Sequence, residues 1–341
     1  MINLVEKLCL LNGASGNEDA VRNFILSEIK DYCKAEVDVN GNIIAFKKGK
    51  KPAKNKVMLD AHMDEVGFII TSVTDNGMLR FATVGGIEVP TLMGSRVTVN
   101  NRVGVIGVKP IHLCEDEEKS RLPKVDDLLI DIGAENAEDA LKYVSIGDIG
   151  TFEKKFVNLG NDLYKANAID DRIGCAAVIK LLKEESEFDF YATFTVGEEL
   201  GLRGAATAAY TVSPDFAVVF EATTAADIQG TPKGKEVCFA GKGAAVSFMD
   251  NSTLYNHNLF EKTLDIAKKN NITVQTKTYV SGGNNAGAIH LSKGGVKTIT
   301  LSLPCRYIHS PSSLASKTDT ESVLNLGREL LKYLSSKDKN D

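Results

Sequence analysis

The sequence contains four groups of acidic and histidine residues that could together bind metal ions and catalyse hydrolysis. They are His62-Met63-Asp64-Glu65, Ala168-Ile169-Asp170-Asp171-Arg172, Val196-Gly197-Glu198-Glu199-Leu200-Gly201, and the pair Glu221 and His309. Imidazole nitrogens and carboxylate oxygens are ligands that zinc, cobalt and manganese all accept. Two metals about 3.5–4 Å apart, sharing carboxylates, form a common hydrolytic arrangement. The combination of groups therefore predicts a two-metal site.

Taken singly, the first two groups also have ordinary explanations. His62 could lie in a surface turn, and the adjacent acids Asp170 and Asp171 could cap a helix and interact with its dipole. In the functional interpretation, Asp64 accepts the second ring N–H of His62 and fixes its tautomer. Asp170 then bridges two metals, and Asp171 pairs with Arg172 nearby.

The acids of the other two groups are harder to explain without a cation. Glu198 and Glu199 follow a predicted strand, where adjacent like charges repel unless something positive lies between them. One of them would bind a metal and the other would take a proton from the attacking water. Glu221 follows a second buried strand, where a carboxylate is costly unless it is paired or bound to metal.

An alternating pattern of helices and strands must position these groups. After Ala166, apolar periodicity predicts helices at residues 174–184, 202–210, 259–268, 286–291 and 321–334. It predicts strands at residues 57–59, 191–196, 216–220, 272–274 and 296–301. Such alternation is typical of an α/β sheet covered on both faces. In open α/β sheets the ligand crevice lies outside the carboxyl ends of the strands, where these groups occur.

A different texture interrupts this pattern between residues 67 and 161. Short strand-like runs follow one another there, separated by turn signals such as Asp75-Asn76-Gly77, which is typical of a small all-β module. Earlier in the chain, Asn40-Gly41 between two β-rich runs predicts a hairpin. We therefore expect residues 1–66 and 162–341 to form one α/β domain, with residues 67–161 inserted as a β module.

Composition excludes several classes of function. The 341 residues carry a formal net charge of -5, which argues against a nucleic-acid partner. The six cysteines form no C-x-x-C pair, so a thiolate zinc site or a redox motif is not expected. The chain has neither a signal-peptide pattern nor the ~20 apolar residues of a membrane span, and we expect a cytoplasmic protein without membrane contact. Nucleophilic serine and phosphate-loop motifs are also absent from the sequence.

These motifs resemble the M42 family of metalloaminopeptidases. The matching segments are His62-Met63-Asp64-Glu65-Val66-Gly67, Asp170-Asp171-Arg172, Gly197-Glu198-Glu199-Leu200-Gly201-Leu202-Arg203-Gly204 and Arg306-Tyr307-Ile308-His309-Ser310-Pro311. The resemblance spans nearly the whole chain in the right order. It implies a zinc-peptidase-like, three-layer α/β/α catalytic domain with an inserted, small β-barrel dimerisation domain. It further implies dimers that assemble into dodecamers enclosing a chamber, and short peptides as substrates.

The same resemblance assigns roles to the residues. One divalent metal would be held by His62, Asp170 and Glu221, and the other by Asp170, Glu199 and His309, with zinc or cobalt, or else manganese, as the ion. Glu198 would be the general base, Asp64 the partner of His62, and the Asp170–Asp171 peptide bond would be cis. Asn285 and Arg306 are expected to contact substrate. These are nine residues in all, and they are His62, Asp64, Asp170, Glu198, Glu199, Glu221, Asn285, Arg306 and His309.

Two departures from the family pattern concern Glu221 and Asn285. Many members have Asp at both positions; a longer carboxylate at 221 can still bind metal, whereas a neutral amide at 285 would alter substrate binding. The leading hypothesis is an aminopeptidase in which Glu198 deprotonates the water that attacks the first peptide carbonyl. The alternatives are a glycan hydrolase, because some members carry an endoglucanase label, and a non-catalytic member of the family.

Overall fold

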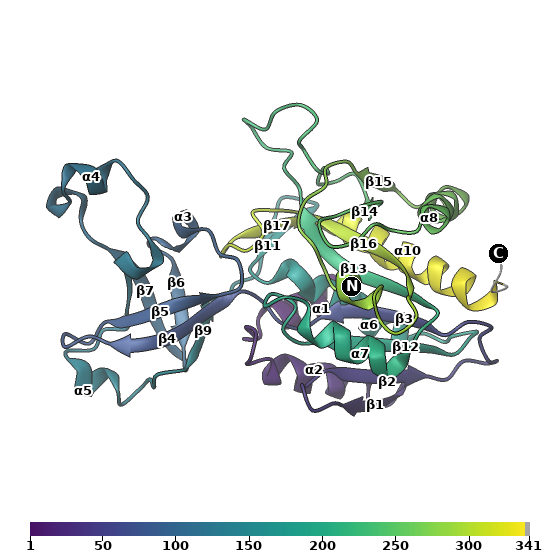
Figure 1. The fold of residues 1–341 in the computed structure, drawn as a ribbon, viewed down its shortest axis with the longest axis horizontal. Coiled ribbons are helices and arrows are strands. Elements are labelled where there is room, and N and C mark those ends of the chain that lie inside the picture. Colours follow the sequence, from purple (N-terminus) through teal and green to yellow (C-terminus); the bar gives the residue numbers. More distant parts are fainter. Residues whose placement is uncertain (338–341) are drawn as a thin grey trace.

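The computed structural model describes residues 1–337, which form a large mixed sheet flanked by helices and a separate closed barrel (Figure 1). The sheet has eleven strands, nine of them in the order β1-β2-β12-β3-β13-β16-β17-β11-β10, with β14 and β15 branching from β16. Their bounds are β1 Lys34–Val37, β2 Ile43–Lys47, β3 Val57–His62, β10 Val157–Leu159, β11 Leu163–Ala166, β12 Phe190–Thr195, β13 Phe216–Thr224, β14 Ala244–Ser247, β15 Val274–Lys277, β16 Lys297–Arg306 and β17 Ser313–Ser316.

The helices around this sheet cover both of its faces, which gives the three layers that the sequence predicts. They are α1 Ile2–Cys9, α2 Asp19–Ile29, α6 Ile169–Lys183, α7 Arg203–Val212, α8 His257–Lys269, α9 Ala286–Ile289 and α10 Lys317–Ser336. Helices α6 and α10 pack on β13 and on each other, and α7 packs on α9 and β12.

The centre of the sheet consists of four mutually parallel strands in the order β12, β3, β13 and β16. Parallel strands place their carboxyl ends at one edge, so the residues that end each strand meet there. The register pairs Thr195 of β12 with His62 of β3. It also pairs Val219 of β13 with Asp60, so that Glu221, two residues further along, lies level with His62.

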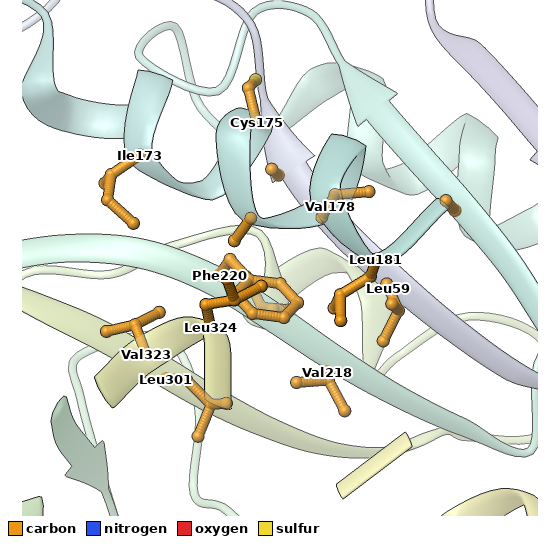
Figure 2. Close-up of a cluster of buried hydrophobic side chains, with 14 of the residues drawn as sticks. Leu59, Ile173, Cys175, Val178, Leu181, Val218, Phe220, Leu301, Val323 and Leu324 are labelled. Carbon is orange, nitrogen blue, oxygen red and sulfur yellow. The ribbon is translucent and has the colours of Figure 1, made fainter. Parts of the chain in front are cut away.

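The central strands are apolar because helices cover them on both sides, as is typical of parallel sheets. Figure 2 shows Val218 and Phe220 of β13 among side chains of α6 and α10. Gly327 of α10 allows this close approach, since a Cβ atom there would lie 2.4 Å from Cζ of Phe220. This packing holds the strand that carries Glu221 against the helix that begins at the Asp170 motif.

The barrel closes in the order β4-β5-β8-β7-β6-β9 and stands at one end of the molecule (Figure 1). Its strands are β4 Gly67–Val73, β5 Leu79–Val84, β6 Arg96–Val99, β7 Arg102–Val108, β8 Leu128–Asp131 and β9 Ile149–Phe152. Short helices lie between them: α3 Val89–Leu92, η1 Ile111–Leu113, α4 Asp116–Lys119, η2 Val125–Asp127 and α5 Ala137–Ala140. Phe68 contacts Phe81 and Phe152 edge-on at the centre of a separate apolar core.

Some predicted elements differ in their bounds. The expected strands at 216–220 and 296–301 are longer and end at Thr224 and Arg306, so Glu221 lies inside β13 and not after it. The strand predicted at 272–274 forms instead at Val274–Lys277, and β14 was not predicted. The hairpin predicted at Asn40-Gly41 is confirmed by the antiparallel pairing of β1 and β2.

The segment that leads from the barrel back to the large sheet tests where the predicted insert ends. Strand β10, Val157–Leu159, pairs with β11 in the large sheet, although it falls within the range predicted for the insert. The division at residues 66 and 161 stays a prediction. Across residues 1–337, no helix combines the length and the apolar character that crossing a bilayer requires.

Candidate active site

Strands β3 and β13, the segments that follow β12 and β16, and the start of one helix bring the predicted ligands together near the carboxyl edge of the parallel strands. His62 ends β3, and its Nε2 lies 3.2 Å from Oδ1 of Asp170 and 3.5 Å from Oε1 of Glu221. Asp170 belongs to the first turn of α6, and Glu221 to β13. All three side chains are buried. One imidazole nitrogen and two carboxylate oxygens thus converge on one small volume.

A second group of the same kind lies on the other side of Asp170. Nε2 of His309 is 3.3 Å from Oδ2 of Asp170 and 3.2 Å from Oε1 of Glu199. Ligand atoms of Asp170, Glu199 and His309 all lie within 4.8 Å of one another, the spacing of groups that could hold an ion. The two oxygens of Asp170 therefore face two different imidazoles. Asp170 occupies the position of a carboxylate shared between two sites.

The local backbone around these residues departs from regular geometry. The Asp170–Asp171 peptide bond is cis, and both residues have non-helical torsion angles although they lie within α6. Ala168 precedes them with φ 56°, and His309 itself has φ 58° in the left-handed region. Residues other than glycine seldom adopt that region, and such residues cluster at functional sites.

Burial and neighbouring charges shift the pKa of most groups in the cluster. Burial would lower the pKa of His309, but hydrogen bonds to Asp170 and Glu199 outweigh it and raise the pKa to about 11. Burial would raise the pKa of Asp170, but the same imidazole contacts outweigh it, and the pKa falls well below its usual range. Burial raises the pKa of Glu221 well above its ordinary value, and the nearby charge of Asp170 adds to this. The cluster has more carboxylates than its imidazoles can neutralise.

The donor set fits divalent metal ions. Oε2 of Glu221 is buried and accepts no hydrogen bond from any described residue, and the buried Oε1 of Glu199 has the His309 imidazole, 3.2 Å away, as its one contact among residues 1–337. A buried acceptor without a partner is costly unless something else binds it. Mixed nitrogen and oxygen donors suit zinc, cobalt and manganese. The unpartnered oxygen of Glu221 and the incompletely satisfied oxygen of Glu199 therefore point to cations as the missing partners.

Asp64 holds the residues of this cluster in position through hydrogen bonds. Its carboxylate accepts hydrogen bonds from Oγ of Ser15 at 2.7 Å and from the backbone N–H groups of Glu198 and Glu199 at 3.0 and 3.1 Å. Nδ1 of His62 lies 3.0 Å from the main-chain oxygen of Asp64 and 3.4 Å from its Oδ1. Asp64 thus orients the His62 ring and also fixes the backbone that carries both glutamates.

The pairing predicted between Asp171 and Arg172 is wrong. The Asp171 carboxylate accepts from the backbone N–H groups of His62 at 3.2 Å and Gly174 at 2.9 Å. Arg172 donates instead to Oε1 of Glu65 at 3.1 Å. Although an oxygen of Asp171 lies near His62 and Glu221, these backbone bonds already occupy both of its oxygens.

Glu198 and four of the five metal-binding candidates, all but His62, face a cavity of about 480 Å³. Asp170, Glu198, Glu199, Glu221 and His309 all contribute to its lining. Burial raises the pKa of the Glu198 carboxyl to about 8, and nearby His62 lowers it only in part. Two other surface cavities, of about 540 and 670 Å³, contain none of the predicted site residues.

Two residues expected to contact substrate lie outside this cavity lining. Asn285 is buried, and its Nδ2 donates to Oδ2 of Asp60 and to Oγ1 of Thr195, both at 2.8 Å. Arg306 donates twice to the carboxylate of Asp227, each time at 2.7 Å. Because both polar groups are committed to other residues, Asn285 ties β3 to β12, and Arg306 anchors the loop after β13.

Sequence reasoning missed other residues that line the cavity. They include Thr223, Lys277, Ser281 and Ser302. Lys277 ends β15, which the sequence pattern predicted to stop at residue 274, and Ser281 lies in the loop that follows. Thr223 lies in the part of β13 that the prediction cut short. The uninterrupted stretch of strand-forming residues that begins at Phe216 and reaches Thr224 could have indicated that Thr223 belongs to the strand.

Comparison with known proteins adds a consistent set of matches. A family model described as M42 glutamyl aminopeptidase matches residues 41–326. Lysyl aminopeptidase from Pyrococcus furiosus is 33% identical over 347 residues, covering 98% of each chain. A TET aminopeptidase structure from Thaumarchaeota archaeon SCGC AB-539-E09 matches with a TM-score of 0.95 and 32% identity, covering 99% of this chain and 98% of the other.

A further solved structure is described by its assembly. It is the TET1 peptidase of Pyrococcus horikoshii, which can assemble into a tetrahedron or a large octahedral shell. It matches with a TM-score of 0.86 and 34% identity, covering 96% of this chain and 98% of that chain.

Proposed function

The chain belongs to the M42 glutamyl aminopeptidase family, and from this premise we propose that it is a two-metal aminopeptidase that removes N-terminal residues from short peptides. The observation that carries the proposal is the position of Asp170. Its two carboxylate oxygens face His62 and His309 at 3.2 and 3.3 Å, with one further glutamate beside each imidazole. That arrangement supplies two adjacent ligand sets from one bridging residue.

In this proposal His62, Asp170 and Glu221 would hold one ion, and Asp170, Glu199 and His309 the other. Divalent zinc, cobalt or manganese would suit these donors. Once bound, such ions would polarise the scissile carbonyl and lower the pKa of water. Asp64 keeps His62 oriented and, through the backbone N–H groups of Glu198 and Glu199, keeps the two glutamates in place.

Glu198 is the proposed general base. It lines the cavity beside the ligands, and no described residue donates a hydrogen bond to its carboxylate, so that group is available to substrate and water. A base is most effective when its pKa lies near the working pH, and burial moves Glu198 in that direction. The carboxylate would accept the proton of the attacking water and then pass it to the departing amine.

Self-association through the barrel is also part of the proposal. Val103, Val105 and Val108 of β7 and Ile111 and Leu113 beyond it are exposed, at 41–67% of their surface. Contiguous exposed apolar residues mark interaction surfaces. Because the Pyrococcus horikoshii relative forms closed shells, we propose dimers built on this face and a dodecamer built from the dimers. Confinement in such a chamber would restrict substrates to short peptides.

Two further points complete the proposal. All six cysteines are unpaired, which supports a cytoplasmic location, where thiols stay reduced. The glycan hydrolase alternative receives no support from the site, because its carboxylates are interleaved with two imidazoles. That alternative would require the protein to hydrolyse a glycan and to retain this activity in the presence of EDTA.

The test is release of N-terminal residues from short peptides by protein loaded with Zn²⁺ or Co²⁺. We expect EDTA to abolish release, and Glu198→Gln to lower kcat by ~10²–10⁴-fold while metal content is unchanged. Glu187→Gln, an exposed acid far from the cavity, serves as the matched control and should leave kcat unaltered. Undiminished release by Glu198→Gln would remove Glu198 as the base.

A further inference from the structure

The two histidines among the metal-binding candidates are oriented by different parts of the chain. Nδ1 of His62 lies 3.0 Å from the main-chain oxygen of Asp64, two residues further along the same strand end. Nδ1 of His309 lies 2.8 Å from the main-chain oxygen of Gly86, a residue in the barrel segment that follows β5. The two contacts have the same chemistry, but the second one reaches the metal-binding candidates from the barrel.

The contact with Gly86 determines which ring nitrogen of His309 carries a hydrogen. A main-chain oxygen can only accept, so Nδ1 must be the donor. Nε2 is then the nitrogen that faces Oδ2 of Asp170 at 3.3 Å and Oε1 of Glu199 at 3.2 Å. Histidines that bind metal commonly donate their other ring N–H in this way, which fixes the tautomer and the orientation of the ring. The Gly86 carbonyl therefore presents Nε2 of His309 to the proposed position of an ion.

His309 depends on such a contact more than His62 does. The side chain of His62 is 1% exposed, so packing restricts its ring on all sides. The side chain of His309 is 31% exposed, and its residue lies in an irregular loop after β16. In this loop Tyr307 and His309 have φ angles of 59° and 58°, in the left-handed region. Because packing leaves this ring partly free, the hydrogen bond to Gly86 is what holds its Nδ1 side in one orientation.

Packing of the barrel fixes the position of Gly86 from both sides. Gly85 before it has φ 82°, and a Cβ atom there would lie 2.8 Å from Cγ1 of Val66. Ile87 after it packs against the apolar core of the barrel, and Leu92 of α3 is fully buried in that core. Helix α3 lies at the side of the barrel that faces the sheet domain (Figure 1). The Gly86 oxygen is therefore placed by contacts that belong to the barrel.

We propose that Gly86 of the barrel is a positioning residue for the metal site, and that its main-chain oxygen holds His309 ready to bind an ion. The inference rests on the proposed two-metal function. It gives the barrel a role in the site that is separate from self-association. The ligand set that contains His309 is oriented from the barrel, whereas the set that contains His62 is oriented from the end of its own strand. Changes in the barrel should therefore affect the two sets differently.

The first experiment measures the binding of Co²⁺ to the metal-free protein by calorimetric titration, without turnover. Wild type should show two binding events, and His309→Ala identifies the event of the His309 set by weakening or abolishing it. Replacing His309 with Nδ1-methylhistidine removes the hydrogen that Gly86 accepts and leaves Nε2 free. We expect this change to weaken the His309 event by ~10–100-fold, the usual effect of losing such a partner, and to spare the other event. The same replacement at the exposed His257 is the matched control and should change neither event.

A pair of barrel variants tests whether the packing of the barrel places Gly86. Leu92→Ala removes the anchor of α3, close in sequence to Gly86, whereas Ile130→Ala opens a cavity at β8 in the same apolar core. Both residues are fully buried, so both variants should lower the thermal midpoint. We expect Leu92→Ala to weaken the His309 event by at least ~10-fold and Ile130→Ala to leave both events at wild-type affinity.

The outcomes separate this inference from the proposed function. Wild-type affinity for both events after methylation of Nδ1 of His309 would overturn the role of Gly86 and leave the two-metal site intact. Equal weakening of both events would likewise overturn that role, because it would reflect a general loss of structure. Equal effects of Leu92→Ala and Ile130→Ala would overturn the part assigned to barrel packing. If wild type shows fewer than two Co²⁺ events, or His309→Ala keeps both at full affinity, the two-metal proposal fails and the role of Gly86 fails with it.

Discussion

Two buried charge clusters in this molecule, built from adjacent residues of the chain, differ in how their charged groups are partnered. The first, the junction cluster, consists of Glu65, Lys154 and Arg172. Each of its side chains is at most 9% exposed. The second is the metal cluster of His62, Asp170, Glu199, Glu221 and His309. The clusters share their segments, since Glu65 follows Asp64 and Arg172 follows Asp171 in the chain.

In the junction cluster each charged side chain has an oppositely charged partner within the chain, with the single acid Glu65 between two cations. Glu65 contacts both Lys154 and Arg172, and Nδ2 of Asn167 donates to it at 3.3 Å. Arg172 also donates to the main-chain oxygens of Leu8 and other residues of the N-terminal segment. Lys154 follows β9, so this cluster joins the barrel to the sheet domain. Its charges have structural partners.

The metal cluster lacks partners of this kind, because its three acids outnumber its two imidazoles and Oε2 of Glu221 accepts no hydrogen bond from residues 1–337. The difference teaches how to distinguish a structural buried charge from a functional one. The junction cluster should be needed for folding whether or not metal is present. The metal cluster should cost stability when empty and add it when filled.

The largest expected effect is on the junction cluster. Glu65→Gln leaves Lys154 and Arg172 buried without their counterion, which should lower the free energy of unfolding by about 3–5 kcal/mol. Urea denaturation of the metal-free protein measures this. Glu185→Gln, which breaks an exposed pair with Lys50, should give no measurable change. Equal midpoints for the two variants would mean that the junction cluster is not structural.

At Glu221, in contrast to Glu65, substitution of the acid by its amide is expected not to lower the stability of the metal-free protein. Glu221→Gln removes a buried acid that lies beside Asp170, so the metal-free protein should remain as stable as wild type or become more stable. Wild type at a metal concentration ~100 times Kd should gain about 2.7 kcal/mol, and the variant should lose most of this gain. Denaturation with and without Zn²⁺ gives both values. A large loss of stability in metal-free Glu221→Gln would show that Glu221, like Glu65, is needed for folding and would contradict this prediction.

The pH dependence of metal-free stability follows from the metal cluster. The pKa of Glu198 is raised from 4.5 to about 8, so the native state binds more protons than the unfolded state in that window and stability falls as pH rises through it. The raised pKa of His309, from 6.5 to about 11, acts in the same direction at higher pH. Thermal midpoints of the metal-free protein should therefore fall from pH 5 to pH 8. A rise over this range would contradict the assigned shifts.

The smallest effect is expected at Asn285. Asn285→Ala removes the amide that joins Asp60 of β3 to Thr195 of β12 and should cost about 1–3 kcal/mol, as for a buried hydrogen-bonding group left unpaired. KM should change little if this residue has no contact with substrate. Thermal denaturation and steady-state kinetics measure the two effects. A large rise in KM without loss of stability would return Asn285 to the substrate-binding set.

Much of the site could be predicted because its ligands follow strand ends. His62, Glu198 and Glu199 stand where an apolar run stops, and the topology of parallel strands then brings those stops together. Lys277 and the true partner of Arg172 could not be predicted in this way. Their contacts join segments far apart in sequence, and a local sequence pattern does not indicate which distant segments will pack together.

The most direct test of the central claim is the number of metal ions that each chain binds. The protein should be saturated with Zn²⁺ or Co²⁺, freed of excess ion and assayed for metal by mass spectrometry. We expect two ions per chain in wild type and in Glu198→Gln, and fewer in both His62→Ala and His309→Ala. A wild-type stoichiometry of zero or one, or two ions retained in both histidine variants, would contradict the two-metal site.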